Sequence, residues 1–202
     1  MTTAPDPLAP FDPGTLSAGA RDELERLGLL SPAGAIRPAA FARRAPPPGV
    51  AKRTISAPAV LSDARAYGSA FPRGLRLDFG GLTLILISGT ASVDEEGRTV
   101  HPGDFAAQCF RTYRNIAALL AAEGATWHDV VRTTCYLANI ERDYAEFNRI
   151  RSSLFAWMGL DPLPASVGVQ ARLCRGDLLI EIEAMALLPG APPAGAARRE
   201  VP

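Results

Sequence analysis

Histidine and cysteine are scarce in this sequence of 202 residues. It contains two histidines, His101 and His128, and three widely spaced cysteines, and no pair has the short spacing of a zinc site. We therefore expect neither a metal centre nor a catalytic triad built on histidine. The odd number and wide spacing of the cysteines are typical of a reduced, cytoplasmic protein and not of a disulfide framework.

Net charge and long apolar runs are also absent. Twenty-one basic residues balance 21 acidic ones, so no overall field attracts nucleic acid or an anionic membrane. No apolar run approaches the ~20 residues of a membrane-spanning helix. The first residues also lack the basic and apolar segments of a signal peptide. We expect a cytoplasmic protein that has neither a nucleic-acid nor a membrane partner.

Hydrophobic residues make up 48% of the chain, which is enough for one substantial core. Residues 1–56 are rich in proline and are predicted to form an extension, with a short helix that follows an N-cap at Ser17. Residues 57–189 are predicted to form one domain. Residues 190–202 are predicted to be a disordered tail.

The pattern of the predicted domain alternates between strand and helix periods. Two β-rich stretches flank a turn at Gly80 and Gly81, and amphipathic helices are expected near residues 104–124 and 142–159. Strands are expected before, between and after these helices, in the order β-β-α-β-α-β-β. The pattern therefore predicts an α+β fold, with a mixed β-sheet and two helices packed on one face.

The last predicted strand, "LLIEIEAMALL", contains two carboxylates in an apolar run. Because side chains alternate along a strand, Ile180, Ile182 and Ala184 face one side and Glu181 and Glu183 face the other. We expect the isoleucine side to meet the helices. The glutamates then lie on a face that a single chain leaves exposed.

Several motifs together resemble the Rid (YjgF-like) reactive-intermediate deaminase superfamily. They are "SGTAS", the join "G…VVRTT", the short "PAS" and the terminal "IEIEA", which together span about residues 70–188. The resemblance implies a chorismate-mutase-like α+β fold, a homotrimer and a cleft between subunits. It also implies hydrolysis of imines or enamines to a keto acid and ammonia, without metal or cofactor.

The sequence departs from this family at the position that binds the substrate. In the deaminases an arginine after "PA" pairs with the substrate carboxylate, whereas this chain has Ser166 there, and Gly168 stands where a cysteine is frequent. The segments "YGSAFPRGLRL" and "RLCRGDLLIEIEA" are similar to parts of the chorismatases, which are related lyases or hydrolases. This similarity suggests an enzyme of secondary metabolism.

The resemblance assigns roles to individual residues. Glu181 aligns with the glutamate that lies near the attacking water, and in an apolar cleft it would have a raised pKa and act as general acid or base. The predicted substrate-binding residues are Phe71, Arg73, Ser88, Gly89, Thr90, Asn148 and Ser166. Arg73 is favoured over Arg172 and Arg175 as the cation that replaces the missing arginine.

These observations favour a cofactor-free Rid-like enzyme of a biosynthetic pathway, which acts on a small imine, enamine or enol-ether substrate. Three alternatives remain open from the sequence. The first is a 2-aminoacrylate-type imine deaminase, and the second is a chorismatase-like lyase or hydrolase. The third is a trimeric metabolite-binding protein without catalytic activity, since a fold does not fix a function.

Overall fold

The computed structural model describes residues 12–31, 33–35 and 49–190. The chain divides into two compact units, residues 1–47 and 48–202. Almost all of the predicted disordered tail lies beyond residue 190, outside the described residues. Most of the proline residues near the start of the chain also lie outside the described residues.

The first unit contains the predicted short helix. Helix α1 covers Ala18–Arg26 and follows a 3-10 turn at Pro13–Thr15. Ser17 is its N-cap, because its hydroxyl accepts a hydrogen bond from the Ala20 N–H. The capping residue chosen from the sequence is thus confirmed.

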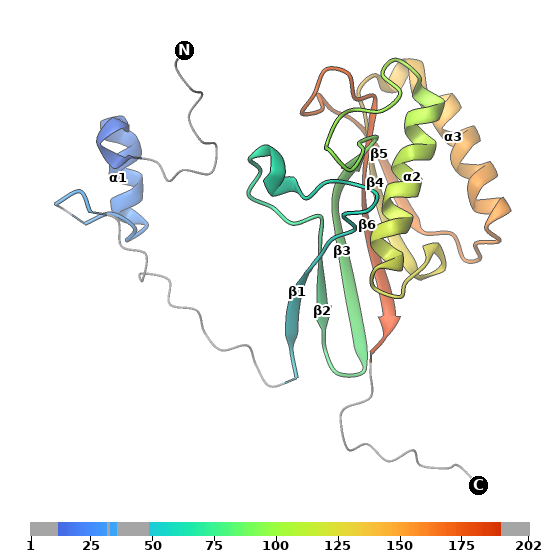
Figure 1. The fold of residues 1–202 in the computed structure, drawn as a ribbon, viewed down its shortest axis with the longest axis horizontal. Coiled ribbons are helices and arrows are strands. Elements are labelled where there is room, and N and C mark those ends of the chain that lie inside the picture. The colour runs from blue at the N-terminus through green and yellow to red at the C-terminus, as the bar shows by residue number, and fades with distance from the viewer. Residues whose placement is uncertain (1–11, 32, 36–48, 191–202) are drawn as a thin grey trace, which may run out of the picture. The chain divides into compact units, whose positions relative to one another are not determined.

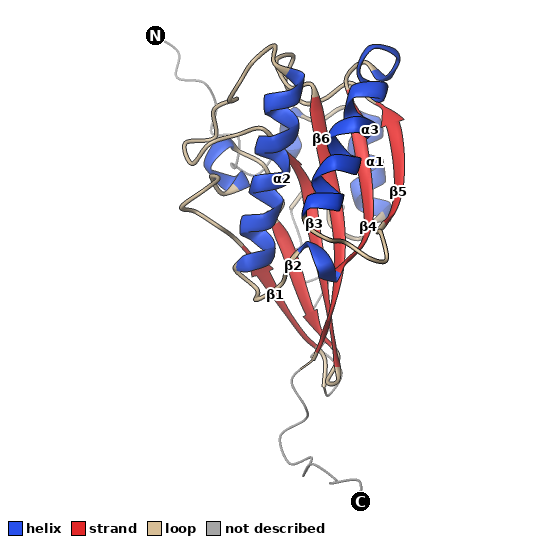
Figure 2. Cartoon of the chain, turned by 90° about the vertical axis from the view of Figure 1, so that its right-hand side faces the viewer, coloured by secondary structure: helices blue, strands red, loops and turns tan. Residues whose placement is uncertain are grey.

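The second unit is built on one mixed sheet with the strand order β1-β2-β3-β6-β4-β5. Neighbouring strands are antiparallel except for the parallel pair β4 and β5. Figure 1 traces the chain through these elements, and Figure 2 shows helices α2 and α3 across one face of the sheet. The elements are β1 (Ala51–Ile55), β2 (Gly74–Asp78), β3 (Leu82–Ala91), α2 (Phe105–Ala121), β4 (Val130–Leu137), α3 (Ile140–Trp157), β5 (Ala165–Gln170) and β6 (Ile180–Pro189).

The α+β architecture and the order of elements from β2 to β6 agree with the sequence pattern. Strand β1 adds to that pattern at the edge of the sheet, where it pairs with β2 inside the stretch predicted to be an extension. Only Ile55 is buried on this strand, whereas Lys52 and Arg53 are exposed. An edge strand with so little buried surface has no apolar alternation to reveal it.

The core lies between the sheet and the two helices. Ile85 and Ile182 from the sheet and Ile116 and Phe147 from the helices are fully buried there. Burying each of these side chains stabilises the fold by about 1.5–3 kcal/mol. Burial also raises the pKa of the Cys109 thiol, which behaves as a small apolar core residue.

The opposite face of the sheet is apolar but open. Leu86 on β3 pairs with Leu75 on β2 and with Met185 on β6. Because residues paired across strands lie on the same face of a sheet, these three half-buried side chains form a row. Leu187 continues the row and is 39% exposed. An open apolar face of this kind is typical of an interaction surface.

Candidate active site

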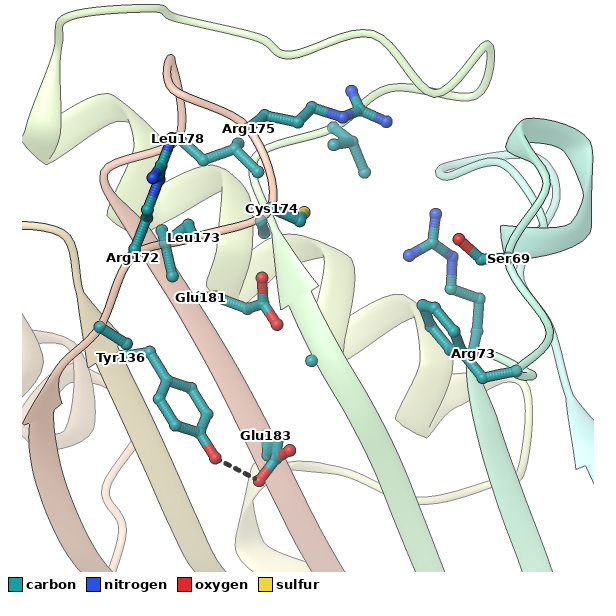
Figure 3. Close-up of a pocket in the computed structure, with 15 residues that line it drawn as sticks. Ser69, Arg73, Tyr136, Arg172, Leu173, Cys174, Arg175, Leu178, Glu181 and Glu183 are labelled. Carbon is teal, nitrogen blue, oxygen red and sulfur yellow. Dashed lines mark hydrogen bonds between the residues drawn. The ribbon is translucent and has the colours of Figure 1, made fainter. Parts of the chain in front are cut away.

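A cavity of about 390 Å³ lies where β3 ends and β6 begins. Its walls come from β3, β4 and β6, from the segment 69–73 before β2, and from the loop 171–178 that leads into β6. In Figure 3 the carboxylate of Glu181 points into this space between Arg73 and the loop. The cavity therefore brings charged side chains from distant parts of the sequence to one end of the sheet.

A bulge in β3 makes room for Glu181. The pairing of β3 with β6 shifts register between Ile87 and Thr90, and Gly89 lies within this shift. A Cβ atom on Gly89 would lie 1.9 Å from Oε1 of Glu181. Only glycine at this position lets the carboxylate lie against the bulge, so the prediction of Gly89 as a site residue acquires a geometric reason.

The surroundings of Glu181 favour its neutral form. Burial raises the pKa of Glu181, the nearby charge of Glu183 raises it further, and the charge of Arg73 lowers it. No hydrogen bond to the Glu181 carboxylate is formed by any described residue. A carboxyl group that is enclosed and free of hydrogen bonds is suited to exchange a proton with a bound molecule.

Glu183 is held in a different way from its neighbour. The hydroxyl of Tyr136 on β4 donates a hydrogen bond of 3.0 Å to Oε2 of Glu183 (Figure 3). Burial and this hydrogen bond raise the pKa of Tyr136, so its hydroxyl remains a donor. Of the two carboxylates, Glu183 is exposed and anchored, and Glu181 is the half-buried one.

Arg73 and Phe71, two of the residues predicted to bind substrate, line the same cavity. Arg73 is buried, and its Nε donates to the carbonyl of Ser62 over 2.7 Å. Phe71 is 38% exposed at the cavity wall. The arginine thus supplies a fixed positive charge near Glu181, and the phenyl ring supplies an apolar surface.

The two hydroxyl residues around Gly89 are bound to the backbone. Ser88 Oγ donates to the carbonyl of Pro72 over 2.8 Å, and Thr90 Oγ1 donates to the carbonyl of Ser88 over 2.8 Å. Thr90 is fully buried, and neither residue is part of the cavity wall. Both hydroxyls stabilise the bulge that positions Gly89.

Asn148 and Ser166 lie together at a different place, between α3 and the edge strand β5. They are joined by Arg151, whose Nη2 donates to Oδ1 of Asn148 over 2.6 Å and whose Nη1 donates to Oγ of Ser166 over 2.9 Å. Neither residue lines the cavity that holds Glu181. The predicted site residues therefore form two separate groups within one chain.

Sequence reasoning missed Tyr136 and Arg151. Tyr136 alternates with Thr134 on the open side of β4, where it pairs in register with Glu181, so strand pairing is the signal that finds it. Arg151 follows Asn148 by three residues, the spacing that places two helical side chains on one face. That spacing was visible in the sequence once Asn148 had been chosen.

Within residues 12–31, 33–35 and 49–190, no three His, Cys, Asp or Glu side chains come together in a group able to hold a metal ion. The helices of the same ranges include none with the length and apolarity needed to cross a membrane.

Comparison with known proteins identifies the fold and its family. The model of the family described as endoribonuclease L-PSP matches residues 81–188, from the start of β3 almost to the end of β6. The chain belongs to this family. It is a member of the Rid superfamily, as its motifs predict.

Individual relatives match about half of the chain. A RutC family protein of Pyrococcus abyssi is 35% identical over 102 residues, which cover 50% of this chain and 76% of that protein. The rat 2-iminobutanoate/2-iminopropanoate deaminase is 31% identical over 103 residues, covering 51% of this chain and 72% of the deaminase. The crystal structure of the YjgF gene product of E. coli aligns with a TM-score of 0.55 and 27% identity, over 66% of this chain and 97% of that one.

The family match includes residues of both candidate groups in this Rid protein. Gly89 and Glu181 fall inside residues 81–188, and so do Asn148, Arg151 and Ser166. Arg73 and Phe71 precede the matched range. The cavity around Glu181 is thus built partly from the family domain and partly from the segment that leads into it.

Proposed function

We propose that this Rid protein hydrolyses a small imine or enamine to a carbonyl compound and ammonia, with Glu181 as general acid and base. The observation that carries the proposal is the enclosed Glu181 carboxylate, which lies against the Gly89 bulge and has a raised pKa. A general acid or base works best when its pKa lies near the working pH. The name of the rat relative supports an imine as the substrate class.

The proposed reaction uses one water molecule. Glu181 takes a proton from water as the water oxygen forms a bond to the imine carbon, and the protonated carboxyl then passes this proton to the nitrogen. This gives a carbinolamine, and Glu181 next takes its hydroxyl proton and delivers it to the nitrogen as the C–N bond breaks, so ammonia leaves and the carbon keeps the oxygen as a carbonyl. For a 2-imino acid the products are a 2-oxo acid and ammonia, and Glu181 returns to its starting form.

We further propose that the protein works as a homotrimer with its active sites in clefts between subunits. The open apolar face of the sheet supports association, because a row of leucines and Met185 would otherwise contact water.

Reducing conditions in the cytoplasm suit the three free cysteines, of which Cys109 and Cys135 are buried.

The size of the cavity favours a second candidate, a larger substrate such as an enol ether of a secondary pathway. Ligand pockets of about 300–1,000 Å³ hold molecules much larger than a four-carbon imine, and the cavity at Glu181 measures about 390 Å³. Phe71, Leu173 and Leu178 give it an apolar wall for a ring or chain. Protonation of an enol-ether oxygen by Glu181 would use the same acid.

The test compares wild type with Glu181→Gln on 2-iminobutanoate, which a dehydratase generates in situ from threonine. We expect wild type to accelerate formation of the 2-oxo acid and Glu181→Gln to lose at least about a hundredfold of that acceleration, the scale of a lost general acid–base. Glu96→Gln, on a surface loop, is the matched control and should keep full activity.

Two outcomes would count against the proposal. If Glu181→Gln turned over the imine as fast as wild type, the carboxylate would have no role in the chemistry. A wild-type trimer that bound a metabolite but accelerated neither the imine nor an enol ether would be the binding protein of the third alternative.

A further inference from the structure

Arg151 is a cation held in place by neutral partners. Its guanidinium donates to Asn148 and Ser166 through two different nitrogens, and its central carbon lies 5.0 Å from the centroid of the buried Phe147 ring. No carboxylate of the described residues lies within ion-pair distance of it. Arg149 on the same helix, by contrast, forms an ion pair with Glu146.

This arrangement leaves the charge of Arg151 available. A guanidinium has five N–H donors, and the two known acceptors use one on each terminal nitrogen. Neutral acceptors fix the orientation of the group but do not neutralise its charge. The planar fork is therefore preorganised to bind a carboxylate with its remaining donors.

A cavity of about 510 Å³ lies next to the guanidinium. Phe155, Leu160 and Leu163 contribute apolar wall, and the exposed Ser166 contributes a hydroxyl. Asp161 also lines this cavity but makes no ion pair with Arg151. The space beside the cation is thus largely apolar, and such surroundings strengthen a charge–charge contact.

The position of Ser166 connects this cation to the active site. The resemblance to the deaminases implies an arginine at the position of Ser166, and the Ser166 hydroxyl accepts a hydrogen bond from Arg151. The positive charge absent from residue 166 on β5 is therefore present within 2.9 Å of its side chain, supplied from α3. We propose that Arg151 binds the carboxylate of the substrate in this protein.

The inference rests on the proposed function and assigns the two ends of the substrate to two copies of the chain. Glu181 and Arg151 line different cavities of one chain. Strand β5 is at the edge of the sheet, with Val167 and Val169 about 40% exposed. A second copy docked at this edge is what brings its Glu181 to the carboxylate held by Arg151.

The first experiment removes the charge of Arg151. Arg151→Met should raise the KM for 2-iminobutanoate by about 10- to 100-fold, the range of a lost hydrogen bond to a charged group, and change kcat much less. Arg149→Met, two residues away on the same helix and exposed, is the matched control and should behave as wild type. An unchanged KM in Arg151→Met would overturn the proposal.

A double variant that moves the arginine distinguishes loss of the positive charge from loss of folding. Arg151→Ser combined with Ser166→Arg moves the guanidinium from the helix to the strand and keeps the same two residue types. We expect the double variant to recover a KM within a few-fold of wild type. If Arg151→Ser alone and the double variant were equally impaired while both remained folded, charge at this place would not be the cause.

A binding measurement separates this proposal from the proposed function. 2-Oxobutanoate, a stable carboxylate of the product class, is titrated into wild type, Glu181→Gln and Arg151→Met. Binding by the first two and not by the third supports the role of Arg151 even if no imine is turned over. Equal binding by all three would contradict it even if the enzyme is an active deaminase.

Mixing the two inactive variants tests the two-copy arrangement. If Glu181 and Arg151 of different subunits share a site, subunit exchange between Glu181→Gln and Arg151→Met creates some sites with both native residues. Random exchange at equal amounts should then restore activity to about a quarter of the wild-type sites. No recovery after confirmed exchange would place both residues in a site within one chain and refute the arrangement.

Discussion

The carboxylate of Glu181 and the guanidinium of Arg151 are positioned by opposite means. The carboxylate of Glu181 occupies the space left by the missing side chain of Gly89, and any larger residue at position 89 would fill that space. Arg151 is placed by contacts, through Asn148, Ser166 and the face of Phe147. The carboxylate is enclosed and without hydrogen bonds from the described residues, whereas the guanidinium is held by several of them.

This difference matches what each group is proposed to do. A group that exchanges protons must change charge easily, and strong hydrogen bonds to one form would resist that change. A group that binds a carboxylate must keep its charge and orientation, and an arginine held by neutral acceptors does both. A change beside Glu181 is therefore expected to lower kcat, and the loss of a contact to Arg151 is expected to raise KM.

Filling the gap beside Glu181 should have the largest effect. In Gly89→Ala the new methyl would overlap Oε1 of Glu181, so the carboxylate must move away from the bulge. A displacement of about 1 Å costs roughly a hundredfold in rate. We expect kcat to fall at least by this factor while 2-oxobutanoate binding, assigned to Arg151, remains, as measured by turnover and titration calorimetry.

Gly81→Ala provides the matched control for this change. Gly81 lies in the turn before β3, and a Cβ there would meet no atom within 4 Å. It should retain wild-type turnover. Full activity in a folded Gly89→Ala variant would show that the gap does not position the carboxylate.

Removing a contact of Arg151 should have a smaller effect of a different kind. Asn148→Leu deletes the acceptor 2.6 Å from Nη2 but leaves Ser166 and Phe147 to hold the guanidinium. Loss of one such charged hydrogen bond predicts a KM about tenfold higher, with kcat and the pH dependence of the rate little changed. Steady-state kinetics across pH check this, and a lower kcat at unchanged KM would contradict it.

The sequence predicted the two halves of this comparison unequally. Glu181 was predicted from strand alternation and a family motif, and Gly89 from a motif at the end of a strand, and these features are local in the sequence. The sheet and its two helices were predicted for the same reason. Strand β1 was not, because an edge strand with one buried residue has no periodic signal.

Arg151 escaped prediction because its role depends on three-dimensional contacts. The sequence shows that residue 166 is serine, but the cation proposed to replace the arginine comes from a helix 15 residues earlier in the chain. Arg73, Arg172 and Arg175 were considered because they lie in conspicuous segments. Arg73 lines the Glu181 cavity, where it is buried, bonded to Ser62 and lowers the pKa of the carboxylate, and its contact with a substrate stays a prediction.

The enclosure of Glu181 should also reduce the stability of the fold. The pKa of Glu181 is higher in the folded protein than its ordinary value of 4.5, so ionisation opposes folding. This penalty is absent below the ordinary value and fully present above the folded value. Glu181→Gln should therefore raise Tm by a few degrees at pH 8 and not at pH 4, as measured by calorimetry. A lower Tm at pH 8 would mean that the ionised carboxylate is stabilised by its surroundings.

The smallest expected effect is the change that Glu183 causes in the pKa of Glu181, the other carboxylate on β6. The charge of Glu183 helps to raise the pKa of Glu181, so Glu183→Gln should lower that pKa. If ionised Glu181 is the base, the acidic limb of the kcat/KM profile moves to lower pH by a fraction of a unit, whereas Glu96→Gln on the surface leaves it in place. Arg151→Met should move this limb less and in the opposite direction, because loss of a positive charge at the far end of the site raises the pKa of Glu181. A limb that moved to higher pH in Glu183→Gln, or that moved equally in Arg151→Met, would show that the two halves of the site are not electrostatically distinct.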